Sequence, residues 1–213
     1  MSAISIPPSM GLSLIETQSA ILPPGYLAKF KTFHATPYFY LLQGLCLVGY
    51  GLKEIVLDHP GTKQQPLNQR IKTVFKEFKE QCSKGWSSIQ YNIQHGLLFA
   101  ACGLCEMGVA LNRMGFLPLG PLAPLLTVGD FGFFLYACYL TVQHNVQRYQ
   151  DIDASTATKR SAVLGIINGL CYLFWITSIL FQAPSLAPLL FCSVGLLTGA
   201  LKILSDFLGG SAP

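Results

Sequence analysis

The stretch that decides the fold runs from residue 95 to residue 142 and reads HGLLFAACGLCEMGVALNRMGFLPLGPLAPLLTVGDFGFFLYACYLTV. It holds one apolar run from about His95 to Asn112 and another that ends near Val142, each close to the ~20 residues with which a helix crosses a bilayer. Between the runs lie Gly115, Pro118, Gly120, Pro121 and Pro124. Because glycine and proline do not continue a helix, the stretch predicts a transmembrane helical hairpin with a tight reversal.

Three further apolar runs lie on either side of this hairpin. One extends from about Ala162 to Phe181 and the next to about Leu204, with a turn at Gln182–Ser185, so a second hairpin is expected. The first run of the chain, over 35–57, is interrupted by Gln43, Lys53 and Glu54 and is either transmembrane or re-entrant. The predicted fold class is therefore an all-α membrane protein with four spans in two hairpins, a marginal first segment and an amphipathic interfacial helix.

The domain organisation follows from these runs. We expect a flexible tail over 1–34, the first segment over 35–57, a basic amphipathic segment over 58–94, the first hairpin over 95–143, a polar loop over 144–161, the second hairpin over 162–207 and a short tail over 208–213. Charged residues are only 11% of the 213 residues and apolar residues are 51%, whereas soluble domains carry about 25% charged residues. The composition excludes a disordered tail, a secreted disulfide scaffold and a classical nucleic-acid-binding protein.

The basic residues are distributed unevenly about the predicted spans. Two loops separated by two crossings carry nine of them: Lys63, Arg70, Lys72, Lys76, Lys79, Lys84, Arg148, Lys159 and Arg160. The opposite turns carry only Arg113. Since cytoplasmic loops are enriched in Lys and Arg, the basic loops should face the cytoplasm. We expect a shallow first segment, with both termini on that side.

Apolar residues recur at helical spacing between Leu67 and Tyr91: Ile71, Val74, Phe75, Phe78, Cys82 and Trp86. The other face carries lysines and glutamates, which is typical of a helix that lies in the plane of a membrane surface. Lys72, Lys76, Lys79, Lys84 and Trp86 are the candidate contacts with anionic lipid headgroups or with a protein partner. The alternative is a helix packed on the protein's own loops.

Glu106 and Asp130 are the costliest residues in the predicted spans, because a carboxylate in mid-membrane is unfavourable and frequently functional. They fall at similar depth on neighbouring helices and could share a proton, or Arg113, seven residues after Glu106, could balance the charge. An interhelical polar contact and a proton or ion relay are both open. His95 and His144, at corresponding helix ends, could face each other, as haem ligands do or as interface residues.

Small residues four apart mark the second hairpin as the candidate for close helix packing: Gly165, Gly169, Gly195 and Gly199. No group of residues assembles a reaction, so we expect no enzyme, no cofactor and no metal. The leading function is a membrane-organising or partner-docking protein that contacts the lipid bilayer, self-associates or binds a partner through 58–94. The alternative is a small transporter or proton-coupled component that uses Glu106 and Asp130.

A Ser-, Ile- and Pro-rich amino terminus without a secretory signal, followed by hydrophobic hairpins with basic loops, resembles the inclusion membrane proteins of Chlamydia. The matching parts are residues 95–142 and 162–204, with Pro118–Pro124 and Gln182–Ser185 as the turns. The resemblance implies export by type III secretion, insertion into a host-derived inclusion membrane, and soluble parts that face the host cytosol. The chain departs from that pattern in its second hairpin and its short tail after Phe207. The alternative location is a bacterial cell membrane.

Overall fold

The computed structural model describes residues 36–60, 62, 64–181 and 186–208. The tail predicted over 1–34, most of that over 208–213 and the turn at Gln182–Ser185 lie outside these residues. The described part is helical and has no strand. Its elements are α3 (Pro37–Val56), α4 (Leu67–Cys82), the 3₁₀ turn η1 (Trp86–Ser88), α5 (Tyr91–Arg113), the 3₁₀ turn η2 (Gly120–Leu122), α6 (Ala123–Gln150), α7 (Thr156–Leu180) and α8 (Leu186–Leu208).

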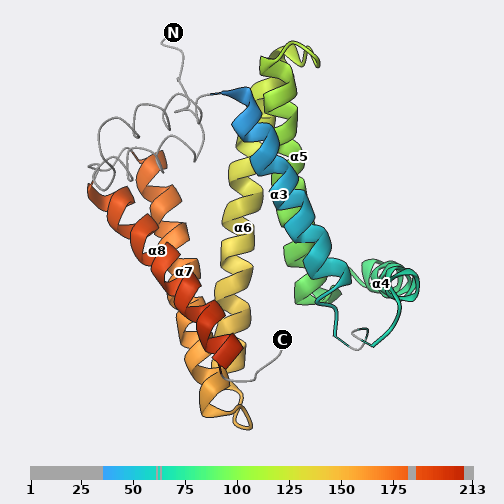
Figure 1. Cartoon of the computed structure of the whole chain (residues 1–213), viewed down its shortest axis with the longest axis vertical. Helices are drawn as coiled ribbons and strands as arrows, with labels where there is room; N and C mark the ends of the chain where they lie inside the picture. The colour runs from blue at the N-terminus through green and yellow to red at the C-terminus, as the bar shows by residue number, and fades with distance from the viewer. Residues whose placement is uncertain (1–35, 61, 63, 182–185, 209–213) are drawn as a thin grey trace.

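The long helices pack in the order α3, α5, α6, α7, α8, each against the next (Figure 1). The predicted all-α class is confirmed, with four helices long and apolar enough to cross a membrane. These four are α3, α5, the Gly120–Gln150 stretch and Thr156–Ser178, and the 23-residue α8 contains a further apolar helix over its described residues, Leu190–Ser205. The first segment is thus one of these four, and α8, which contains the last predicted run, packs against α7.

The first segment forms α3, an uninterrupted helix of 20 residues packed along α5. Lys53, in its last turn, is exposed, and a charged side chain at a helix end reaches the surface of a bilayer at little cost. Glu54 in the same turn is instead paired with His95 of α5. A re-entrant segment would need a break in the helix, and α3 has none. Residues 37–56 therefore fit the transmembrane alternative for the first segment.

The connection between α5 and α6 is a compact turn. Gly115 has a φ of 78°, a left-handed conformation that residues with a side chain adopt only with strain. The Asn112 side chain accepts a hydrogen bond from the Leu119 amide at 3.0 Å, which closes the loop over the end of α5. The reversal lies where glycine and proline predicted it, and it sets α5 and α6 antiparallel.

Helix α4 is shorter than the amphipathic pattern predicts. It ends at Cys82, and Gly85 follows with a φ of 102°, so Trp86 lies in η1 instead of on the helix. Val74 of α4 packs in a cluster of buried residues with Ile89 and Ile93. In Figure 1, α4 is seen nearly end-on, so it runs across the long axis of the other helices.

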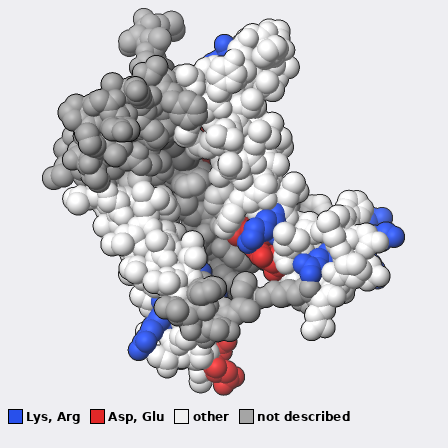
Figure 2. Space-filling view, in the orientation of Figure 1, with Lys and Arg blue, Asp and Glu red and all other residues white. Residues whose placement is uncertain are grey.

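All connections from α3 to α5 and from α6 to α7 lie at one end of the bundle, here called the basic end (Figure 1). Among the described residues, every Lys and Arg except Arg113 belongs to the parts of the helices and connections at this end. Figure 2 shows most of the blue surface there and little on the opposite half. The two loops that the charge pattern placed on one side of the membrane are thus on one side of the fold.

Candidate functional site

Glu106 of α5 and Asp130 of α6 are both buried, with 4% and 5% of their surface exposed. The Cys102 thiol, one turn before Glu106, donates to the Asp130 backbone carbonyl at 3.6 Å, so the two acidic residues lie one helical turn apart along the contact of α5 with α6. Glu106 Oε2 and Asp130 Oδ1 each lack a hydrogen-bond partner in the described part of the chain. A buried carboxyl oxygen without a partner is costly, so this pair is a candidate site.

Arg113 does not join the two acids. Its guanidinium carbon lies 5.0 Å from the centre of the Tyr40 ring, where cation and ring attract each other. The contact ties the end of α5 to the beginning of α3. The structure therefore brings Glu106 and Asp130 together and places Arg113 at the edge of the bundle.

A second buried polar cluster lies nearer the basic end and joins three helices. Glu54 Oε2 of α3 is 2.6 Å from His95 Nδ1 of α5, and His95 Nε2 is 2.9 Å from Thr141 Oγ1 of α6. Tyr50 donates to the other oxygen of Glu54 at 2.7 Å. The side chains of His95 and Glu54 are 8% and 14% exposed. In the sequence Glu54 is merely an interruption of an apolar run, and only the packing of α3 on α5 pairs it with His95.

The hydrogen bonds of this cluster indicate which of its atoms carry protons. Thr141 donates its hydroxyl proton to the Ala137 carbonyl at 2.9 Å, so its oxygen accepts from His95 Nε2. His95 then needs a proton on Nε2, and its contact with Glu54 needs a second one, held by either Nδ1 or the carboxyl group. In both arrangements the Glu54–His95 pair has no net charge, which lowers the cost of burying it.

The two histidines that could have faced each other are separated by an aromatic ring. Tyr91 stacks on His144 with centroids 3.9 Å apart and on His95 at 5.0 Å. Both ring nitrogens of His95 are already within hydrogen-bonding distance of Glu54 and Thr141. This arrangement fits the reading of the two histidines as interface residues. Within the described ranges no group of three or more His, Cys, Asp or Glu could hold a metal ion.

The candidate surface residues lie along α4 and just after it. Lys72, Lys76, Lys79 and Lys84 are exposed, and Lys76 lies 4.0 Å from Glu80 on the same helix. Trp86 is 41% exposed, and its indole N–H donates to the Tyr136 hydroxyl of α6 at 3.0 Å. The lysines are thus presented outward, whereas Trp86 connects the loop to the bundle.

The four glycines of the second hairpin all lie at helix contacts. A Cβ at Gly169 would lie 3.2 Å from the Cys138 carbonyl of α6, and one at Gly165 would meet the Asn145 side chain. Gly195 faces Tyr172 and Gly199 faces Asn168, both on α7. The pair on α7 therefore packs against the first hairpin, and the pair on α8 packs within the second.

The closest backbone approach lies elsewhere, between α3 and α5. A Cβ at Gly44 would lie 2.6 Å from the Gly103 carbonyl oxygen, and one at Gly96 would lie 2.6 Å from the Gly51 carbonyl oxygen. Two opposed glycine pairs thus fix the crossing of these helices. The contact glycines are seven residues apart on each helix, Gly44 and Gly51 on α3 and Gly96 and Gly103 on α5. A spacing of seven returns to nearly the same face of a helix, so this matched spacing is a signal for the contact in the sequence.

Comparison with known protein families, with curated proteins and with solved structures finds no match. The class of the protein therefore rests on its own architecture. Four apolar helices, each long enough to cross a bilayer, are compatible with a multi-pass membrane protein.

Proposed function

We propose that the protein is a non-enzymatic multi-pass membrane protein with a membrane-organising role, in which α4 lies on the bilayer surface. The observation that supports this role is an apolar strip on α4 that no described part of the chain covers. Leu67, Ile71 and Phe75, spaced four residues apart, are 57%, 50% and 69% exposed. On a helix of about 3.6 residues per turn they form one line.

The charges of α4 fit the same orientation. Lys72, Lys76 and Lys79 lie along one edge of the apolar strip, whereas Glu77 faces the protein, 3.2 Å from His59. An apolar strip bordered by lysines is the pattern of a helix at an anionic membrane surface. Because α4 also runs across the spanning helices (Figure 1), its strip can face the lipid while the bundle crosses the bilayer.

The position of α4 is tested by tryptophan quenching in vesicles that contain phosphatidylglycerol with brominated acyl chains. The two native tryptophans are replaced by phenylalanine, and one is introduced by Phe75→Trp or, as the control on the opposite face, by Gln69→Trp. We expect strong quenching of the probe at 75 and weak quenching at 69, because only the strip enters the acyl region. Equal quenching at both positions, or none at 75, contradicts the proposal and leaves the strip to a protein partner.

A second candidate function is supported by the carboxyl pair. Glu106 and Asp130 are both buried and each has an oxygen without a described partner, as expected of groups that take up and release a proton. The Glu54–His95 pair holds the other carboxyl group and the histidine of α3 and α5, about 16 Å from Glu106 along α5. We rank this function second because no chain of hydrogen bonds between described residues joins the two groups.

Proton coupling predicts that Glu106→Gln with Asp130→Asn abolishes proton flux in reconstituted vesicles, measured with a pH-sensitive dye. The amides keep the shape of the side chains and remove the exchangeable charge. Glu80→Gln, an exposed side chain of α4, is the matched control and should leave flux unchanged. Flux that persists in the double variant eliminates this function, and the pair is then an interhelical contact.

A further inference from the structure

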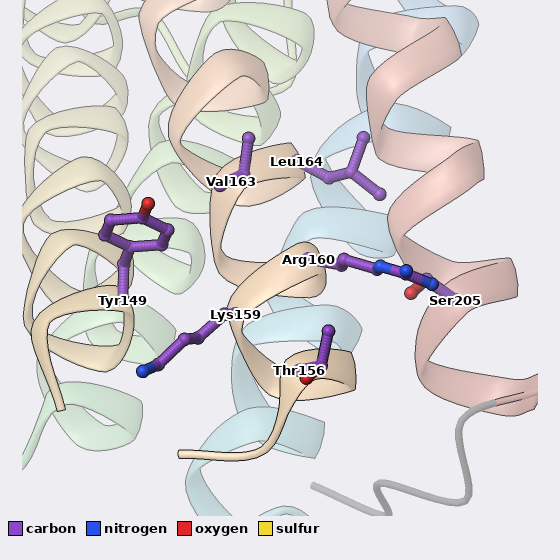
Figure 3. Close-up of a pocket in the computed structure, with 7 residues that line it drawn as sticks. All are labelled: Tyr149, Thr156, Lys159, Arg160, Val163, Leu164 and Ser205. Carbon is purple, nitrogen blue, oxygen red and sulfur yellow. The ribbon is translucent and has the colours of Figure 1, made fainter. Parts of the chain in front are cut away.

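A cavity of about 540 Å³ opens between α6, α7 and α8 near the basic end (Figure 3). One face of α7 forms its floor, with Thr156, Lys159, Arg160, Val163 and Leu164 lining it. Tyr149 of α6 lies on one side and Ser205 of α8 on the other, and Arg160 extends toward Ser205. None of these residues belongs to the carboxyl pair, to the Glu54–His95 cluster or to α4.

The cavity lies where the apolar part of the bundle ends. On α7, residues 161–181 contain no charged residue, and Lys159 and Arg160 come directly before them. On α6, the charge-free run 131–147 ends two residues before Tyr149. Charged side chains, Tyr and Trp gather at the level of the lipid headgroups. In a chain that crosses the bilayer with α6 and α7, the cavity is therefore at headgroup depth.

The lining changes from cationic to apolar along α7. Lys159 and Arg160 lie near its first turn, and Val163 and Leu164 lie one turn, about 5.4 Å, deeper toward the membrane core. This order matches a phospholipid, whose phosphate is at the surface and whose acyl chains begin just below. Thr156, Ser205 and Tyr149 add hydroxyl groups that can donate to phosphate oxygens.

Neither Lys159 nor Arg160 forms an ion pair with an acidic side chain that the structure describes. An Arg can bind phosphate through two parallel N–H bonds, and Arg160 extends toward Ser205 (Figure 3). Lys159 extends to the other side of α7, toward Tyr149, and adds positive charge at that edge of the cavity. The amide groups at the start of α7 favour an anion as well, and the Ser155 hydroxyl already accepts from one of them, that of Thr158, at 3.1 Å.

We propose that this cavity binds the headgroup of an anionic phospholipid, with its phosphate at Arg160 beside Ser205, the positive charge of Lys159 at the opposite edge toward Tyr149, and its first acyl carbons against Val163 and Leu164 (Figure 3). The site would hold one lipid at the junction of the two hairpins, next to the α6–α7 contact. The inference requires only that α6 and α7 cross the membrane. It does not depend on the position of α4 or on proton coupling.

The test measures lipid binding to the full-length protein in detergent by native mass spectrometry and calorimetry. The probes are dioctanoyl phosphatidylglycerol, dioctanoyl phosphatidylcholine and inorganic phosphate. The wild type is compared with Lys159→Gln/Arg160→Gln and with the control Lys72→Gln/Lys76→Gln, which removes the same number of charges from α4. Since all four side chains reach the surface, neither variant should disturb folding.

We expect phosphatidylglycerol to bind the wild type and the α4 control equally. It should bind the Lys159→Gln/Arg160→Gln variant about tenfold more weakly, because the charge-assisted contact of Arg160 and the positive charge of Lys159 are lost. Phosphatidylcholine should bind the wild type about tenfold more weakly than phosphatidylglycerol. Equal binding of the two lipids, or unchanged binding to the cavity variant, overturns the proposal. Competition by inorganic phosphate at the concentration of the lipid also overturns it, because the site then takes free phosphate.

Discussion

Replacing Gly44 and Gly96 by alanine is expected to separate α3 from α5 and to lower the free energy of unfolding by about 3 kcal/mol or more. Each new methyl group would lie 2.6 Å from a backbone carbonyl oxygen of the partner helix, that of Gly103 or Gly51. A flexible side chain could move away, but a carbonyl moves only with its helix. Overpacking of this kind costs about 1–3 kcal/mol at one site, and the two sites lie on one interface.

The change is measured by denaturant titration of the protein in mixed micelles, together with cross-linking of a cysteine pair placed across α3 and α5. Gly49→Ala and Gly132→Ala form the matched control, because a Cβ at either position meets nothing within 4 Å. These controls should leave the free energy of unfolding unchanged or raise it slightly, since alanine is a better helix former than glycine. Equal stability of the two double variants would contradict the close approach of α3 and α5.

The α3–α5 contact also shows what the sequence could not predict. Hydropathy, with the glycines and prolines of the α5–α6 turn, is enough to predict the all-α class, that reversal and the antiparallel hairpin, because these features depend on local chain properties. Which face of one helix meets which face of another depends on the shape of both. Gly44 and Gly51 can therefore be assigned to this contact only once α5 is placed against them. The sequence predicts the close helix packing at the small residues of the second hairpin instead.

In the candidate site, too, some residues can be predicted from the sequence and others cannot. Glu106 and Asp130 could be singled out from the sequence, because a charge in an apolar run is rare and their distances from the turn are similar. The Glu54–His95–Thr141 cluster could not, because its members lie on three helices and Glu54 is 41 residues from His95. Helical spacing predicts Arg113 as a partner for Glu106, but its guanidinium packs on the ring of Tyr40 from the neighbouring helix α3.

The second large effect is expected at the Glu54–His95 pair. His95→Leu should lower the free energy of unfolding by about 3–5 kcal/mol, because it leaves the carboxyl group of Glu54 buried with Tyr50 as its remaining side-chain partner. Glu54→Gln should cost less, since a glutamine oxygen or amide can still hydrogen-bond His95 Nδ1. The double variant Glu54→Leu/His95→Leu should recover part of the loss, because it buries no unpaired charge.

A double-mutant cycle separates the pair from the packing around it. The free energies of unfolding of the wild type, Glu54→Leu, His95→Leu and the double variant should give a coupling of about 1–3 kcal/mol, the range for residues in one polar network. His144→Leu is the control: His144 stacks on the same Tyr91 ring but is not joined to Glu54, so its coupling with Glu54→Leu should be near zero. If His95 and His144 couple equally to Glu54, the contact at 2.6 Å does not hold α3 on the hairpin, and the glycine crossing alone does so.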